Sequence, residues 1–241
     1  MAGSYDDRDG YIWVDGKMVN WRDANVHILT HALHYASSVF EGERAYNGKI
    51  FKSRAHSERL KNSARMIDFE IPYTVDEIEA AKAEVLAASG LRDAYVRAIA
   101  WRGAGEDMGV ASASNPVRLA IAAWEWGAYY GDAKTQGAKL EATGANMFFV
   151  KDGEVHTPDP DCFLNGITRQ TVIEMLREKG IKVHERHIMP EELEGFEQCW
   201  LTGTAAEVTP VGQIGDYRFE VGALTQDIAQ SYERLVRASS L

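Results

Sequence analysis

Short β-prone runs bordered by Asx-Gly pairs recur along this chain and predict β-hairpins. Each pair accepts the positive φ angles of a type I′ turn, whose twist suits two antiparallel strands. The pairs are Asp15-Gly16, Asn47-Gly48 and Asp152-Gly153. Antiparallel sheet is therefore expected to be frequent.

Helical periodicity alternates with these runs. Over 57–69, the apolar residues Leu60, Ala64 and Ile67 share one helical face, and a second helix begins with a capping box at 74–77. The other expected elements are strands at 119–124, 148–150, near 181–188 and at 198–202, and helices ending at Gly90, over 168–179 and over about 225–238. The pattern indicates an α+β fold.

The segment 126–133 is expected to link two lobes. It combines glycines typical of turns with aromatic residues, directly after the apolar strand at 119–124. The sequence therefore predicts a small N-terminal α+β domain over 1–125 and a large C-terminal domain over 134–241.

Composition and charge narrow the range of partners. The chain has 36 acidic and 26 basic side chains, and its net charge of −10 repels nucleic acid and acidic lipid surfaces. No apolar run approaches the roughly 18 residues of a membrane helix, and the N-terminus lacks an apolar targeting region. A cytoplasmic protein is expected. Its two cysteines, Cys162 and Cys199, are expected to be inert packing residues.

Two corners of glycine and threonine are candidate phosphate sites. In the runs 164–172 and 201–207, a glycine lies just before a hydroxyl residue, and a helical pattern follows the first. The unpaired N–H groups at a helix N-terminus attract anions. Upstream, Glu141 supplies a carboxylate just before a strand. A carboxylate opposite two phosphate corners suggests pyridoxal 5'-phosphate (PLP).

These three segments, in this order, resemble branched-chain-amino-acid aminotransferases of the fold-type IV, class-IV PLP-dependent group. The resemblance implies a two-lobed fold, like that of D-amino-acid aminotransferase, with mixed and antiparallel sheets, flanking helices and PLP between the lobes. It also implies a homodimer or higher homo-oligomer. The implied activity is amino transfer between leucine, isoleucine or valine and 2-oxoglutarate.

The resemblance also assigns cofactor contacts. Glu141 would hold the ring nitrogen, and the amides of Ile167 and Thr168, with the Thr168 hydroxyl, would bind the phosphate. Thr204 would close the phosphate site from the second corner. Arg59, in an Arg-x-His-x-x-Arg-Leu element, would be a further cofactor contact.

A second set of residues is implied to bind the substrate. Tyr95 and Arg97 project from one face of an alternating strand. The resemblance implies that this pair accepts the distal carboxylate of glutamate. The full set is Tyr35, Phe40, Gly42, Tyr95, Arg97, Trp126, Tyr129 and Ala205. Glu43 departs from the apolar residue of many relatives and affects the expected edge of the pocket.

One requirement of the family is absent from its expected place. The family carries its Schiff-base lysine on a long segment that would lie between Leu140 and Glu141, and nothing there turns the chain. None of Lys134, Lys139 and Lys151 lies in matching flanks. Two alternatives remain: an active aminotransferase whose lysine segment was not observed, or a non-catalytic PLP-cleft protein with a true deletion. A D-amino-acid aminotransferase or an aminodeoxychorismate lyase is the nearest other enzyme.

A glycine-rich run and a group of histidines do not predict a nucleotide site or a metal site. The glycines of 103–109 do not have dinucleotide-binding spacing. His27, His31 and His34 have helical spacing that could present a zinc site, but they are expected to be packed or hydrogen-bonded structural residues. The same is expected of His184 and His187, and no metal site is predicted.

Overall fold

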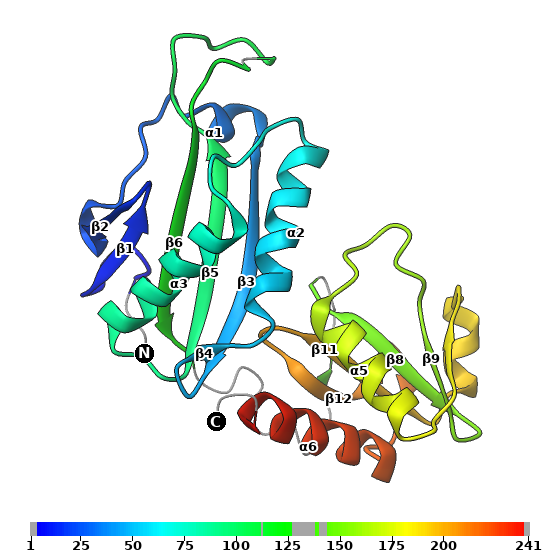
Figure 1. The fold of residues 1–241 in the computed structure, drawn as a ribbon. Coiled ribbons are helices and arrows are strands. Elements are labelled where there is room, and N and C mark those ends of the chain that lie inside the picture. Colours follow the sequence, from blue (N-terminus) through cyan, green and yellow to red (C-terminus); the bar gives the residue numbers. More distant parts are fainter. Residues whose placement is uncertain (1–3, 112, 127–137, 140–143, 239–241) are drawn as a thin grey trace. The chain divides into compact units, whose positions relative to one another are not determined.

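The computed structural model describes residues 4–111, 113–126, 138–139 and 144–238 (Figure 1). The chain divides into two compact units, Met1–Trp126 and Gly127–Leu241. Each unit has its own sheet and is described by itself. Over the described residues, no helix is both long and apolar enough to cross a membrane.

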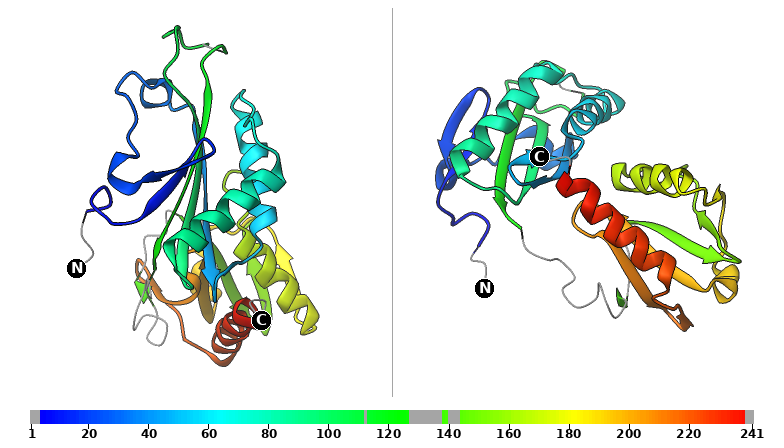
Figure 2. Two further views of the ribbon diagram at one scale, coloured as in Figure 1. Left: turned by 60° about the vertical axis from the view of Figure 1, so that its left-hand side comes forward. Right: turned by 60° about the horizontal axis from the view of Figure 1, so that its bottom comes forward.

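Unit 1 contains an antiparallel six-stranded sheet, in the order β2-β1-β6-β5-β3-β4. Helices α2 and α3 lie side by side on one face of it (Figure 2). The strands are β1 (Tyr11–Val14), β2 (Lys17–Asn20), β3 (Ser38–Tyr46), β4 (Lys49–Ile50), β5 (Ala94–Arg102) and β6 (Val117–Glu125). The helices are η1 (Trp21–Asp23), α1 (His31–Tyr35), α2 (Ser53–Met66) and α3 (Val75–Ser89).

The alternation of β5 separates the core of unit 1 from its opposite face. Ala94, Val96 and Ala98 are fully buried in the cluster that packs against α2 and α3. Because successive side chains of a strand point to opposite faces, Tyr95 and Arg97 lie on the face without these helices. The same alternation in β3 decides where its two glutamates point.

Unit 2 contains a mixed sheet, in the order β10-β9-β8-β11-β12-β13, with β7 paired to β12. The pairs β9–β10 and β7–β12 are parallel, and the other pairs are antiparallel. The strands are β7 (Ala138–Lys139), β8 (Asn146–Lys151), β9 (Glu154–Thr157), β10 (Val183–Glu185), β11 (Gln198–Gly203), β12 (Glu207–Ile214) and β13 (Tyr217–Arg218). The helices are α5 (Ile167–Glu178), η2 (Pro190–Gly195) and α6 (Ala223–Ala238).

All three predicted hairpin turns are confirmed. They join β1 to β2, β3 to β4 and β8 to β9. Both turn residues have positive φ in each case: Asp15 (46°) and Gly16 (88°), Asn47 (50°) and Gly48 (87°), and Asp152 (51°) and Gly153 (75°).

The helix predicted over 57–69 is wrong at both ends. It begins at Ser53, after Lys52 in a left-handed conformation, and ends at Met66. Leu60 and Ala64 are fully buried as predicted, but Ile67 lies beyond the last turn and is 41% exposed. The periodicity identified the buried stripe, whereas the ends were decided by backbone conformations that periodicity does not report.

Unit 2 follows the prediction in part. Helix α5 begins one residue before the predicted start, and β11 matches its predicted range to within one residue. The strand expected near 181–188 is shorter and covers only β10. Strand β12 was not predicted, because Pro210 and Gly212 interrupt its apolar pattern.

Candidate active site

The N-terminus of α5 forms the first predicted corner. Gly166 is the N-cap, and it offers no side chain to accept a hydrogen bond from the first turn of the helix. Asn146 supports this corner, because its Nδ2 donates to the Leu164 oxygen (3.0 Å) and its Oδ1 accepts from the Gly166 N–H (3.1 Å). A Cβ at Gly166 would lie only 2.3 Å from that Oδ1. The corner therefore requires glycine, and the amides of the first turn are available to an anion.

The second corner is the hairpin from Gly203 to Glu207, which joins β11 to β12. Thr202, directly before it, pairs with Asn146. A Cβ at Gly203 would lie 3.6 Å from the Gly144 oxygen, so the corner lies against the chain that enters β8. Asn146 thus contacts one corner through its side chain and borders the other through its backbone pairing. The structure brings the two corners together at the start of β8.

Several predicted residues lie outside the described part of the chain. These are Tyr129, Lys134, Leu140 and Glu141. Glu141 comes three residues before Gly144, the first described residue of the segment that enters β8. The predicted carboxylate is therefore close in sequence to the corners.

Of the candidate lysines, Lys151 lies far from the corners. It ends β8, five residues beyond Asn146, which corresponds to about 17 Å of strand. It is therefore not placed to form a covalent bond with a group held at the corners. The backbone of Lys139 pairs with that of Gln213 in β12.

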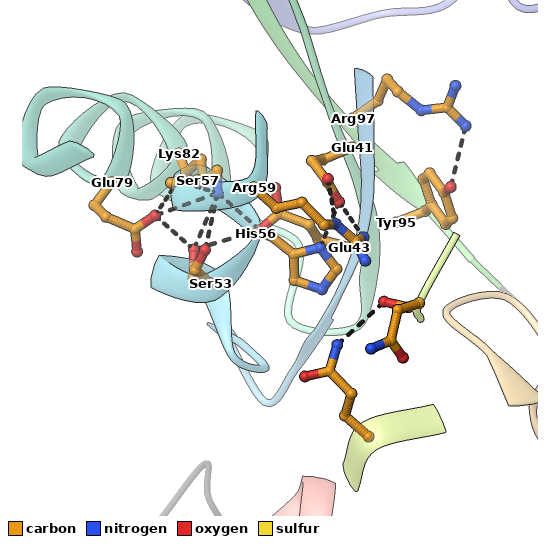
Figure 3. A network of polar contacts seen from close by, with 12 residues as sticks. Glu41, Glu43, Ser53, His56, Ser57, Arg59, Glu79, Lys82, Tyr95 and Arg97 are labelled. Carbon is orange, nitrogen blue, oxygen red and sulfur yellow. Dashed lines mark hydrogen bonds and ion pairs between the residues drawn. The ribbon is translucent and has the colours of Figure 1, made fainter. Parts of the chain in front are cut away.

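Arg59 of α2 lies in unit 1 and forms a fork with Glu41 (Figure 3). Its Nε donates to Oε1 at 2.7 Å and its Nη2 donates to Oε2 at 2.6 Å. The Nδ1 of His56 lies 2.7 Å from the same Oε2. Burial raises the pKa of Glu41, but the hydrogen bonds from Arg59 and His56 outweigh it and hold the pKa below its ordinary value.

Glu43, two residues along β3, points to the same helix-covered face. Its Oε2 lies 2.8 Å from the Nζ of Lys82 in α3, and both side chains are almost fully buried. Burial raises the pKa of Glu43, and its Oε1 has no hydrogen-bond partner among the described residues. Gly42 lies on the opposite face. The expectation that Glu43 affects the pocket edge is therefore wrong, because strand alternation turns it into the core.

The face of β3 and β5 opposite helices α2 and α3 carries four of the predicted substrate residues. Gly42 pairs with Arg97 across the strands, and the Arg97 Nη2 donates to the Tyr95 hydroxyl at 3.0 Å. The Arg97 guanidinium carbon lies 4.2 Å from the centre of the Phe40 ring, in cation–π geometry. The structure thus brings Phe40, Gly42, Tyr95 and Arg97 together within unit 1.

Two tryptophans complete this group. The Tyr95 ring stacks on Trp124 at 5.0 Å between centroids, and it lies 4.8 Å from the ring of Trp126. Trp126 was predicted here, and Trp124 was not. The signal that could have identified Trp124 is its spacing, because it lies two residues before Trp126 on an alternating strand.

Buried donors remain unsatisfied in this group. Among the described residues, the Nε of Arg97 and the Nε1 of Trp124 are buried without a hydrogen-bond partner. An apolar cavity of about 390 Å³, lined by residues that include Ile12, Val14 and Ile99, reaches Arg97 on the same face. Buried donors of this kind are normally satisfied by a ligand or water, so the group has the chemistry of an anion site.

Tyr35 and the histidines have local partners. The Tyr35 hydroxyl donates to the Met108 oxygen at 3.0 Å. His31 is buried and contacts the Ser37 hydroxyl (2.7 Å) and the Gly109 oxygen (3.1 Å), as expected of a structural histidine. The Nε2 of His184 lies 2.6 Å from the Oε2 of Glu154, and His187, although exposed, has its Nε2 3.5 Å from the Oδ2 of Asp161. Within the described residues, no group of three metal-binding side chains is found.

The cysteines differ from each other. Cys199 is fully buried in unit 2, as expected, and burial raises the pKa of its thiol. Cys162 is exposed, so its assignment as a packing residue is wrong. It follows Asp161 in a loop of polar and proline residues.

Comparison with known proteins identifies the family of this chain. The profile of the family described as "Amino-transferase class IV" matches residues 38–135 and 133–214. The chain belongs to the class IV aminotransferase family. The branched-chain-amino-acid aminotransferase of Pseudomonas aeruginosa is 35% identical over 289 residues, which cover 95% of this chain and 94% of that protein.

Solved structures of class IV aminotransferases have the same fold. The branched-chain aminotransferase of Escherichia coli has a TM-score of 0.87 and 30% identity, over 96% of each chain. A branched-chain aminotransferase from "T.th.", solved with pyridoxamine 5'-phosphate, has a TM-score of 0.87 and 31% identity, over 96% of this chain and 95% of that one. The fold-type IV prediction is confirmed.

The comparisons also bear on the missing segment. The stretch of 289 matched residues in the Pseudomonas protein exceeds the 241 residues of this chain, so at least 48 positions (289 minus 241) have no counterpart here. The family match falls into two stretches that overlap at 133–135, close before the join at Leu140–Glu141.

Proposed function

We propose that this protein transfers the amino group between branched-chain L-amino acids and 2-oxoglutarate, with PLP as its cofactor. Relatives named branched-chain-amino-acid aminotransferase match most of the chain, and the structure of one solved relative contains pyridoxamine 5'-phosphate. The observation that carries the proposal is the meeting of the two corners at the start of β8. A further expectation is a homo-oligomer in the cytoplasm.

The residues of unit 2 fit the phosphate end of this cofactor. The amides of Ile167 and Thr168 lie in a helical first turn without a side-chain cap, and Gly166 makes room for the Asn146 side chain that supports this corner. Thr204 would close the site from the second corner, while Glu141 would hold the ring nitrogen and Arg59 would add a cation. When bound, the cofactor supplies the electron-withdrawing ring that amino transfer requires.

Polar and apolar residues would bind different parts of the substrate. Arg97 and the Tyr95 hydroxyl would hold the distal carboxylate of 2-oxoglutarate, and the Ala205 amide would bind the α-carboxylate. The aliphatic side chain of leucine would lie against Tyr35, Phe40, Gly42, Trp126 and Tyr129. In this proposal, domain 1–125 supplies most of the substrate wall, domain 134–241 supplies the phosphate site, and 126–133 links them.

A second candidate function applies if the lysine segment is a true deletion. At least 48 positions of the Pseudomonas relative have no counterpart, and Lys151 does not lie near the corners. A chain without the amine could still bind the cofactor through its phosphate, but turnover would be negligible. A binding protein that retains the cleft is therefore the alternative.

An intact-mass measurement combined with an assay tests the proposal. We expect the protein from its natural source to be heavier than 26.8 kDa and to form glutamate from L-leucine and 2-oxoglutarate. A mass of 26.8 kDa without glutamate formation, but with binding of pyridoxamine 5'-phosphate that Thr168→Ala weakens, would instead indicate the binding protein. No binding of the cofactor would contradict both.

A further inference from the structure

Tyr95 is held in place by an indole ring on the neighbouring strand. Trp124 of β6 lies directly opposite Tyr95 of β5 in the strand register. Their rings stack with centroids 5.0 Å apart and an angle of 29° between the planes. Stacked pairs of this kind stabilise beyond the area that they bury. Trp124 therefore sets the orientation of the phenol.

The N-terminal segment supports Trp124 in turn. The ring of Tyr5 packs edge-on against Trp124 at 5.5 Å, with an angle of 81°. The backbone oxygen of Tyr5 accepts a hydrogen bond from the Trp21 indole at 2.6 Å, and Arg8 lies 4.0 Å over the Tyr5 ring. Trp124 thus contacts a second aromatic ring that is itself held in place.

Gly42 leaves the space that the Tyr95 hydroxyl occupies. A Cβ at Gly42 would lie 2.0 Å from that hydroxyl oxygen, so the phenol lies directly against the β3 backbone. Between this backbone and the Trp124 indole, the ring has little freedom. In this position its hydroxyl accepts the hydrogen bond from Arg97, whose remaining buried Nε has no partner among the described residues.

We propose that Trp124 is a positioning residue that determines how well the site accepts a second carboxylate. The inference rests on the proposed function, in which Arg97 and Tyr95 hold the distal carboxylate of 2-oxoglutarate. Loss of the indole would let the phenol tilt, and Arg97 would lose the hydroxyl that orients its guanidinium. An aliphatic 2-oxo acid has no second carboxylate, so its binding does not depend on this orientation.

Calorimetric titration of the protein loaded with pyridoxamine 5'-phosphate tests the inference without requiring turnover. The ligands are 2-oxoglutarate and 4-methyl-2-oxopentanoate, the 2-oxo acid of leucine. For Trp124→Leu we expect the Kd of 2-oxoglutarate to rise roughly tenfold, the size of one stacked aromatic contact, and that of 4-methyl-2-oxopentanoate less than about twofold. Trp124→Phe, which keeps a stacking ring, should restore most of the affinity for 2-oxoglutarate.

Trp13→Leu is the matched control. Trp13 of β1 makes an aromatic contact of the same size with Tyr73, at 5.3 Å between centroids, but this contact lies in the core that packs against α2 and α3. The ratio of the two affinities should stay at the wild-type value in this variant. A ratio that Trp124→Leu leaves unchanged overturns the inference. So does an equal loss in Trp124→Phe, because the effect would then come from the indole N–H.

The same titrations distinguish a failure of the proposed function from a failure of the positioning role. If the loaded wild-type protein binds neither 2-oxo acid, the substrate assignment itself is wrong. If the wild type binds both and the Trp124 variants bind them with the wild-type affinities, the function stands and the positioning role does not.

Discussion

Glu41 and Glu43 show how strongly two equivalent positions can differ. Both point from β3 toward the helices, yet the pKa of Glu41 is lowered and that of Glu43 is raised. Glu41 uses both oxygens, with Arg59 and His56 as partners. Glu43 is buried with one oxygen unsatisfied by the described residues. The number of hydrogen-bond and ion-pair partners, rather than burial alone, decides the direction in which each pKa is shifted.

The buried pair of Glu43 and Lys82 leads to a stability prediction. Lys82→Met removes the cation from a carboxylate that has no exposure, so we expect the free energy of unfolding to fall by about 3–5 kcal/mol. Urea unfolding measures the change. The double variant Glu43→Met/Lys82→Met should recover most of the loss, because the fully buried carboxylate is then removed as well, and the other partner of Lys82, Glu79, is 27% exposed to solvent. The exposed Lys49→Met is the control, and a loss below about 1 kcal/mol in Lys82→Met would contradict the prediction.

The ion pair of Glu41 predicts a pH dependence. Because the pKa of Glu41 is lowered in the folded protein, its contribution is complete above the ordinary pKa of a glutamate and is lost as pH falls through the lowered value. Glu41→Gln lacks this contribution. The stability difference between wild type and Glu41→Gln should therefore shrink between about pH 6 and about pH 3, as measured by urea unfolding. A difference that does not change with pH would show that Glu41 does not titrate as inferred.

At the scale of elements, the capping box and the terminal glycine predicted for α3 are both confirmed. The capping box of α3 is present as predicted: the Thr74 hydroxyl accepts from the Glu77 N–H, and the Glu77 side chain accepts from the Thr74 N–H. Gly90 ends the helix with φ 66°. The start of α2 was missed, because its N-terminus has no side-chain cap to mark it.

The cap of α3 can be tested directly. Thr74→Ala removes the acceptor for the Glu77 N–H, so the free energy of unfolding should fall by about 1 kcal/mol. Thr74→Ser keeps a hydroxyl and should lose much less. Thermal unfolding followed by circular dichroism compares the three proteins, and equal stability of Thr74→Ala and wild type would show that the cap adds nothing.

The whole molecule consists of two units with separate cores. Leu60, Ile78 and Val96 belong to the core of unit 1, whereas Phe149 and Leu201 belong to a core of unit 2. A unit of this size buries enough apolar surface to fold by itself.

Independent folding of unit 1 is therefore expected. Residues 1–126 produced alone should show a cooperative thermal transition and a near-ultraviolet circular dichroism signal from packed tryptophans. The full chain should then unfold in more than one step. An unfolded fragment, together with a single transition of the full chain, would show that unit 1 depends on the rest of the protein.

The sequence by itself determined the hairpins, the cap of α3, the two corners and the resemblance to class IV aminotransferases. These depend on neighbouring residues, whose φ preferences and hydrogen-bond partners lie within a few positions. Only the tertiary structure decided that Glu43 points into the core and that Trp124 stacks on Tyr95. Those contacts depend on the register between strands far apart in the chain, which local preferences do not specify.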